Sequence, residues 1–287
     1  MVCKNLFMTI VRYDQFRDHI HQRIQTNDTM MGLLAGSKLA SQTLRLTEGS
    51  KILLSDIFPN VDHVRRFNLT TDKAREVLDD AENLLGILAV PQVLALQEDL
   101  IAGMLRLLKI HVPNSGTLPE GDLKAARVHE TLQTKTGGQF TQETLYLFHL
   151  VRLARNAHIH NGGKAGTTIV NGVESASSAT LATWKKITRS EFPHYSKGDP
   201  VQMGLSELIG ILAVSKRLAD EANHMLQTAL PKTAWADIAV ADWLRHARPG
   251  DKNQRNRQLL GLVRLNYKPI GLTQKDLDEA KMRAHVA

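Results

Sequence analysis

The chain has 287 residues, enough for one large domain or two small ones, and its formal net charge is +7. A hydrophobic fraction of 43% and a single cysteine, Cys3, indicate a globular protein without an internal disulfide, which favours a reducing compartment. The N-terminal apolar stretch is too short for a signal peptide, and the longest apolar run, Leu84 to Leu96, contains Pro91 and is too short to span a bilayer. We therefore expect a cytoplasmic protein that makes no contact with a membrane.

Helical periodicity begins early in the chain. The segment 1–69 predicts short helices, such as "QFRDHIHQRI" and "GSKLASQTLRL". From Thr70, a candidate N-cap, apolar residues recur at helical spacing as far as Pro91, which should kink or end the helix. A second long amphipathic helix follows and leads into a loop at "PNSGTLPEGD".

The middle of the chain predicts a helix from Thr141 to about His160 and then an exposed excursion. Within this excursion, 168–170 and 173–175 flank Asn171-Gly172, the favoured two-residue turn of a β-hairpin. A further long helix, "VQMGLSELIGILAVSKRLADEANHML", closes this part. We therefore expect an all-α fold with one small β-hairpin, divided into an N-terminal helical segment (1–69), a helical bundle (70–230) and an appended helical tail (231–287).

One segment of the tail carries most of the net positive charge. Between Arg245 and Lys268, seven cationic side chains are opposed only by Asp251, which leaves a net charge of +6. Such clustering favours a polyanionic partner, because affinity for phosphates grows with the number of cations that reach them. We expect RNA to be this partner, bound by Arg255, Arg257 and Arg264. The alternative is a solvated helix face that aids solubility.

A polar stripe marks the helix that ends near His160. At 100° per residue, His149, Arg152, Asn156 and His160 fall within about 80° of one another, and apolar residues cover the rest of the helix. A polar stripe on a buried helix is costly unless it is paired or lines a cleft or a subunit interface. The following Asn161-Gly162-Gly163 should cap the helix, which places His160 in the last turn, where the helix dipole favours the imidazolium.

Arg155-Asn156-x-x-x-His160, followed by Asn161 and Gly162, resembles the signature of HEPN domains, the nucleotide-binding helical domains of higher eukaryotes and prokaryotes. The resemblance implies an antiparallel bundle of helices over 70–230. It also implies a metal-independent endoribonuclease, without a cofactor, of the toxin or anti-phage defence kind. The active site would lie at the interface of a homodimer, and an antitoxin or other regulatory partner would fit this class.

The resemblance also implies roles for the motif residues. His160 would act as general base or acid on the 2′-hydroxyl and the leaving 5′-oxygen, Arg155 would neutralise the phosphate, and Asn156 would orient a ribose or phosphate oxygen or the His tautomer. We add His149, Arg152 and His158 as candidate substrate-binding residues, which completes the proposed site.

Several alternatives stay open at this point. Arg155 lies about 140° from His160 on an ideal helix, so the last turn is distorted, Arg155 reaches around it, or Arg155 serves the partner's histidine. Arg155 could instead pair with a carboxylate, leaving His160 as a capping residue. His158 and His160 diverge by about 200°, so we expect no metal site. The competing interpretation is a non-enzymatic, HEPN-like dimeric protein that binds nucleic acid or has a regulatory role.

Overall fold

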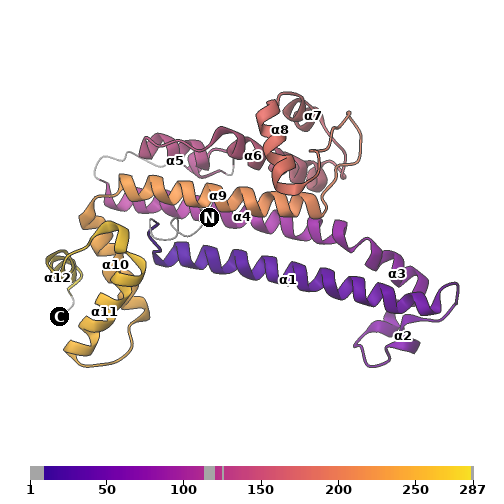
Figure 1. Cartoon of the computed structure of the whole chain (residues 1–287), viewed down its shortest axis with the longest axis horizontal. Coiled ribbons are helices and arrows are strands. Elements are labelled where there is room, and N and C mark those ends of the chain that lie inside the picture. Colours follow the sequence, from indigo (N-terminus) through magenta and orange to yellow (C-terminus); the bar gives the residue numbers. More distant parts are fainter. Residues whose placement is uncertain (1–9, 113–119, 125, 286–287) are drawn as a thin grey trace. The chain divides into compact units, whose positions relative to one another are not determined.

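The computed structural model describes residues 10–112, 120–124 and 126–285 (Figure 1). Cys3 and most of the predicted loop, 113–119, lie outside the described residues. Over the part that is described, the protein contains α-helices and short 3₁₀ helices but no β-strand, which confirms the all-α prediction. The α-helices are α1 (Asp14–Leu44), α2 (Leu54–Ile57), α3 (Thr71–Asp79), α4 (Ala81–His111), α5 (Val128–Thr136), α6 (Gln142–His160), α7 (Thr167–Glu174), α8 (Ser178–Thr188), α9 (Leu205–Ala229), α10 (Lys232–His246), α11 (Lys252–Asn266) and α12 (Gln274–Arg283).

The chain falls into two compact units, each assembled from separated stretches of sequence. Unit 1 comprises the described parts of Met1–Gln22, Ala95–Leu145 and Val214–Ala287, and unit 2 comprises Arg23–Leu94 and Tyr146–Ala213. Helices α1, α4, α6 and α9 contribute residues to both units. The three consecutive segments expected from the sequence stay a prediction about domains.

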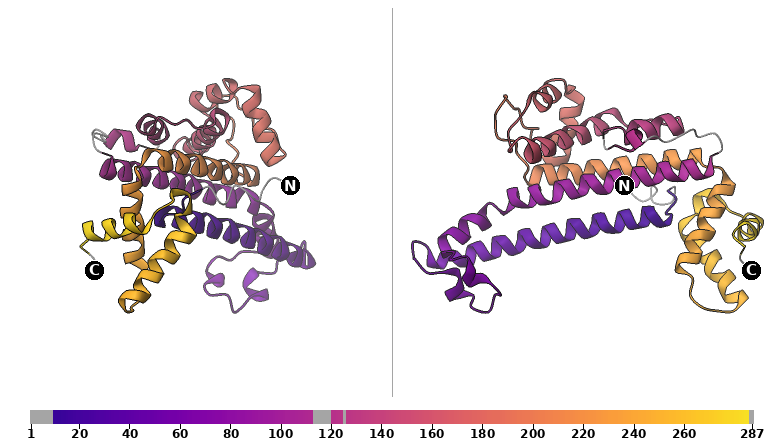
Figure 2. Two further views of the ribbon diagram at one scale, coloured as in Figure 1. Left: turned by 60° about the vertical axis from the view of Figure 1, so that its left-hand side comes forward. Right: turned by 180° about the vertical axis from the view of Figure 1, so that it is seen from behind.

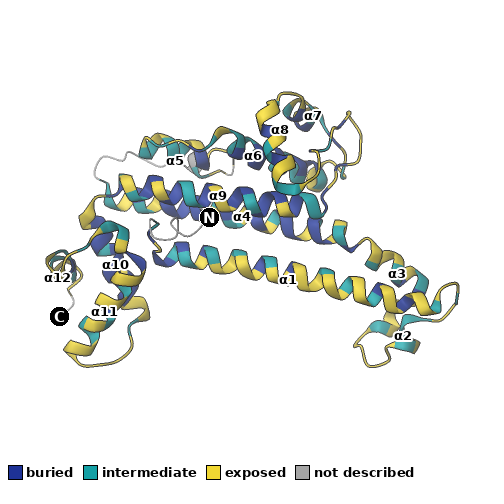
Figure 3. Ribbon diagram, in the orientation of Figure 1, coloured by how far each residue is buried: buried dark blue, intermediate teal, exposed yellow. Residues whose placement is uncertain are grey.

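Helix α1 is one continuous helix of 31 residues, so the prediction of separate short helices in this region is wrong. No proline interrupts it, and its two internal glycines, Gly32 and Gly36, face open space. A glycine in a helix costs only about 1 kcal/mol relative to alanine, which the buried contacts of Met30 and Leu44 offset. Most other positions of α1 are exposed, whereas buried positions gather on α4 and α9 (Figure 3).

The break expected at Pro91 lies elsewhere. Helix α3 begins after Thr70, whose hydroxyl accepts a hydrogen bond from the Lys73 amide at 3.3 Å, as its sequence predicts. Helix α3 ends at Asp79, and α4 begins at Ala81 and continues through Pro91 without ending. Proline removes one helical hydrogen bond, but the fully buried Val90 and Val93 on either side hold this turn by packing.

With Pro91 inside it, α4 is long and apolar enough to cross a membrane by length and composition alone, and 44% of its most apolar window is buried. The core helix of a soluble protein has the same composition. The buried side chains of α4 include Leu94, Ile101 and Leu105, which are the positions of a core helix. Length and composition therefore do not assign α4 to a membrane.

The predicted β-hairpin is wrong, because unit 2 forms the helix α7 over the same residues. Ile169 and Val173, four residues apart, are both buried, and Tyr146 donates a hydrogen bond to the carbonyl oxygen of Gly172 at 2.8 Å. A Cβ on Gly172 would lie 3.2 Å from a methyl group of Leu150, so the glycine lets α7 approach α6 closely. Packing against α6 decides the conformation here, and the Asn171-Gly172 turn signal does not.

In unit 1, helix α10 packs against both α11 and α12 (Figures 1 and 2). The face of α10 that carries Trp235, Ala239 and Trp243, spaced four residues apart, is buried. Helix α12 begins with a capping box, in which Thr273 and Asp276 exchange hydrogen bonds. The tail is therefore a packed helical substructure of unit 1 and not a flexible extension.

Candidate functional site

Helix α6 ends at His160, the residue predicted from the sequence. Gly162 and Gly163 follow with φ values of 61° and 75°, a left-handed backbone that favours glycine. The Asn161 amide donates to the carbonyl oxygen of Ala157 at 3.0 Å, which closes the last turn. This local chemistry brings His160 to the surface of unit 2, where its side chain is exposed.

The chain after α6 is held in place by the segment that precedes α9. The Val201 amide donates to the carbonyl oxygen of Gly163, and the Ala165 amide donates to that of Asp199, each at 2.8 Å. These two bonds fix the start of α7 beside the end of α6, within unit 2. The last turn of α6, which carries the motif residues, therefore lies beside a segment that these hydrogen bonds hold in place.

A cavity of about 180 Å³, which we call the motif cavity, lies between the end of α6 and the start of α7. Asn156 and His160 both line it, as the predicted polar stripe requires. Asn161 and Thr168 also line the cavity but were not predicted as site residues, because the sequence suggested a cap for Asn161 and a strand for Thr168. The remaining lining residues are small or apolar: Leu153, Ala157, Gly166 and Ile169.

Arg155 does not line this cavity, in agreement with its angular offset of about 140° from His160. Its Nε atom is buried and donates to no acceptor, and no carboxylate in the described chain lies within ion-pair distance of its guanidinium. Arg155 therefore has no carboxylate partner among the described residues, which argues against the alternative in which it pairs with a carboxylate of its own bundle. His158 also lies off the cavity, near Gly163.

The two other residues of the polar stripe lie away from the cavity. Burial of His149, reinforced by the charge of Arg152, lowers the pKa of the imidazole to about 4. His149 is therefore neutral at neutral pH, and Arg152 is the cation of this pair. The structure brings Asn156 and His160 together and leaves His149 and Arg152 outside the cavity wall.

The three arginines predicted to bind RNA lie on two different faces of α11. Arg257 and Arg264 are exposed and separated by only about 20° around the helix. Arg255 points about 160–180° away from them, over the ring of Trp243 at 5.1 Å from its centroid. The three predicted RNA-binding arginines are therefore divided between an exposed face of α11 and a face that packs toward α10.

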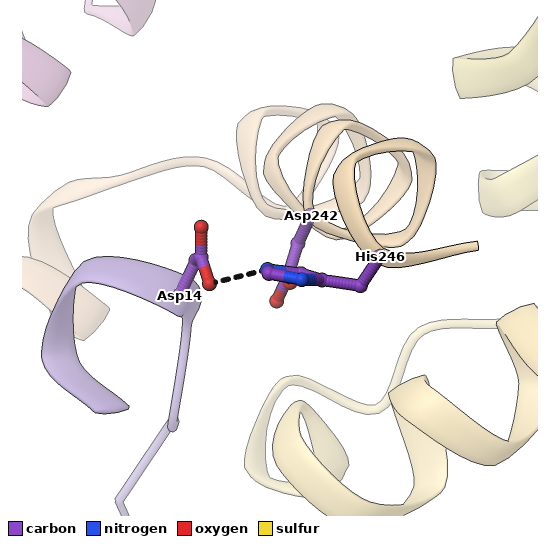
Figure 4. Close-up of side chains that lie close together, drawn as sticks. All are labelled: Asp14, Asp242 and His246. Atoms are coloured by element: carbon purple, nitrogen blue, oxygen red, sulfur yellow. Dashed lines mark hydrogen bonds and ion pairs between the residues drawn. The ribbon is translucent and has the colours of Figure 1, made fainter. Parts of the chain in front are cut away.

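Unit 1 also contains a cluster that the sequence did not reveal. Asp14 at the start of α1 lies beside Asp242 and His246 on α10, with potential ligand atoms of all three within 4.8 Å of one another (Figure 4). His246 Nε2 lies 2.8 Å from Asp14, the contact dashed in Figure 4. Such a group could hold a metal ion by distance alone.

Arginines already occupy both carboxylates of this cluster. Arg17 donates two hydrogen bonds of 2.8 Å to Asp242 and one of 2.9 Å to Asp14, and Arg245 donates another to Asp14. Two guanidinium charges thus balance two carboxylates, so a divalent cation would have to displace them. The arrangement is an ion-pair clamp that joins α1 to α10 within unit 1.

Comparison of the chain with known protein families, with curated proteins and with solved structures found no match. The resemblance to HEPN domains therefore rests on the sequence motif Arg155-Asn156-x-x-x-His160 and the Asn161-Gly162 that follows it.

Proposed function

We propose that the protein is a metal-independent endoribonuclease of the HEPN type that cleaves RNA by attack of the ribose 2′-hydroxyl. The observation that carries the proposal is the cavity at the end of α6, where His160 and Asn156 lie together. Arg155, next to Asn156 in the chain, has no carboxylate partner among the described residues, so its charge is available to a phosphate.

The chemistry follows from the positions of these groups. His160 is the last residue of α6, and its side chain is exposed, so a substrate can reach it. As general base it would take the proton of the 2′-hydroxyl while that oxygen bonds to phosphorus; as general acid it would return a proton to the departing 5′-oxygen. Arg155 would stabilise the charge that builds on the phosphorane, and the products would be a 2′,3′-cyclic phosphate and a 5′-hydroxyl.

A homodimer completes this proposal. Arg155 and His160 leave α6 in different directions, so one chain does not present both to its own cavity. Two copies related by a twofold axis would let Arg155 of one chain serve His160 of the other. We propose RNA as the substrate, a cytoplasmic toxin or anti-phage role, and an antitoxin or regulatory protein as a further partner.

A cleavage assay tests the reaction. Purified protein is incubated with labelled RNA in excess EDTA, and product ends are identified. Cleavage by the wild type should persist. His160→Ala should lower the cleavage rate by the factor typical of general acid–base catalysis, about 10²–10⁴, or by more. Arg155→Lys should also fail, because an ammonium lacks the paired donors of a guanidinium.

His158→Ala is the matched control, because this side chain lies off the cavity and should affect cleavage less. An RNA methylated at the 2′-oxygen of the cut site should resist. Equal activity of His160→Ala and the wild type, or loss of activity on removal of metal, would refute the ribonuclease proposal.

A second candidate function is a non-enzymatic dimer that binds nucleic acid. The observation in its favour is a cationic cavity of about 720 Å³ among α10, α11 and α12, larger than the motif cavity. Binding of RNA without any cleavage by the wild type would select this function.

A further inference from the structure

The three C-terminal helices enclose a groove within unit 1, which we call the tail groove. It has a volume of about 720 Å³ and is lined by Trp243 of α10, Lys252 and Arg255 of α11, and Lys281 of α12, together with other residues of these helices. The packing of α10 against α11 and α12 holds these walls together. The tail groove shares no residue with the cavity at the end of α6.

The charge of the tail groove is positive after its internal pairs are subtracted. Asp278 is the one carboxylate among its lining residues, and it accepts hydrogen bonds from Lys281 at 2.7 Å and from Gln274 at 3.0 Å. These bonds lower the pKa of Asp278, the bond from Lys281 most of all. Lys252 and Arg255 have no ion-pair partner among the described residues, so two cations remain for a ligand.

Arg255 is held on the groove side of α11. Its guanidinium lies 5.1 Å from the centroid of the buried Trp243 ring, a cation–π contact that restrains the side chain. A guanidinium restrained in this way loses less entropy when it binds a phosphate, and its free face can stack on a base. Arg257 and Arg264, on the opposite face of the helix, have no such support among the described residues.

Amide side chains add a second kind of contact. Asn253, Asn256 and Gln274 line the groove beside the cations. Asn256 Oδ1 already accepts a hydrogen bond from Lys281 at 3.4 Å, and Gln274 Nε2 donates one to Asp278 at 3.0 Å. The remaining amide donors and acceptors are of the kind that reads the edges of unpaired bases. An acidic peptide would need only the cations, so the combination of amides, cations and a stackable guanidinium favours a nucleic-acid strand.

We propose that the tail groove is a second RNA-binding site, which takes a single strand with its phosphates on Lys252 and Arg255 and its bases against the amide side chains. The inference rests on the proposed function in taking RNA as the polyanion. It departs from the sequence-based expectation in one respect: Arg257 and Arg264 are outside the site.

Binding is measured with the full-length protein and a short, fluorescein-labelled single-stranded RNA methylated at every 2′-oxygen, followed by fluorescence anisotropy between about 50 and 200 mM salt. The methylated strand cannot undergo the proposed cleavage, so binding and reaction are separated. The double variant Lys252→Gln/Arg255→Gln should bind about tenfold more weakly at low salt. Its salt slope should fall by about 1.4, because each of the two cations neutralises one phosphate in the wild type and each such phosphate on a single strand contributes about 0.7.

The matched control is Arg257→Gln/Arg264→Gln, which removes the same charge from the opposite face of the same helix. We expect its affinity to change by less than about twofold, with an unchanged salt slope. Equal or greater weakening by the control would overturn the proposal, because general charge would then explain binding. Lys252→Gln alone, which leaves the Arg255–Trp243 contact intact, should also reduce the slope, by about 0.7. An unchanged slope in this variant would overturn the proposal as well.

Two further measurements identify the ligand class and separate this proposal from the ribonuclease proposal. Polyglutamate of equal charge should compete poorly with the RNA, and equal competition would mean that the groove takes acidic peptides and would overturn the proposal. His160→Ala is assayed only for cleavage of unmethylated RNA, a reaction that the binding assay with the methylated strand does not measure. Failure of the tail-groove variants to weaken binding thus rejects this site alone, while loss of cleavage is scored only at His160.

Discussion

The clamp between α1 and α10 makes Asp242→Asn an informative substitution. The Asp242 side chain is 1% exposed and accepts two hydrogen bonds from Arg17 at 2.8 Å and one from the Tyr267 hydroxyl at 2.6 Å. The hydrogen bonds to Asp242 raise the pKa of the Arg17 guanidinium. Asparagine keeps the shape of the side chain but removes its charge and one acceptor oxygen, so Arg17 is left with Asp14 as its remaining carboxylate partner.

The magnitude follows from burial. Removal of one partner from a fully buried ion pair costs about 3–5 kcal/mol, because the other charge stays buried without compensation. The Arg17 side chain is 25% exposed, so water can recover part of this cost. We therefore expect the free energy of unfolding to fall by about 2–3 kcal/mol, roughly a third of the stability of an ordinary domain.

Urea unfolding at pH 7, followed by far-ultraviolet circular dichroism, measures this change as a lower midpoint at an unchanged slope. Glu191→Gln is the matched control, since the Lys185–Glu191 pair has side chains that are 60% and 67% exposed and should contribute less than about 1 kcal/mol. If the free energy of unfolding of Asp242→Asn is within about 0.5 kcal/mol of the wild-type value, the clamp does not stabilise unit 1, and burial of the Arg17–Asp242 pair has no energetic consequence.

Three further substitutions test packing and protonation in unit 2. Gly86→Ala should lower the free energy of unfolding by about 1–3 kcal/mol, measured by thermal unfolding, because its Cβ would lie 2.1 Å from the carbonyl oxygen of Met203. The control Gly36→Ala, whose Cβ meets no atom nearby, should raise the free energy of unfolding by up to about 1 kcal/mol. A Gly86→Ala variant more stable than the wild type would contradict the close approach of these two segments. Burial lowers the pKa of His149 from its ordinary value of 6.5 to about 4. Between these two pH values the unfolded chain binds a proton at His149 that the folded chain does not, so the free energy of unfolding falls as the pH drops from 6.5 to about 4. The decrease should approach about 3 kcal/mol at most, and His149→Gln should flatten this part of the pH–stability curve; parallel curves would show that His149 is not held neutral.

Much of the local structure could be predicted because the determining contacts lie within a few residues of one another. The end of α6 follows from Asn161 and two glycines, and the start of α12 follows from Thr273 and Asp276, which bond to each other. The 3.6-residue period predicted the all-α class for the same reason, since it records which side of each helix is apolar. The polar stripe likewise predicted that Asn156 and His160 share one surface, and both line the motif cavity.

Other features were decided by contacts between residues far apart in the sequence. Local propensity favoured a turn at Asn171-Gly172 and a break at Pro91, but burial of Ile169 against α6 and of Val90 in α4 outweighs preferences of about 1–3 kcal/mol. No pattern along the chain pairs Asp14 with Asp242, because only the packing of α1 against α10 brings the two carboxylates to one arginine. The helical period places Arg255 opposite Arg257, but the position of Trp243 on a neighbouring helix decides which of these two faces lines the tail groove.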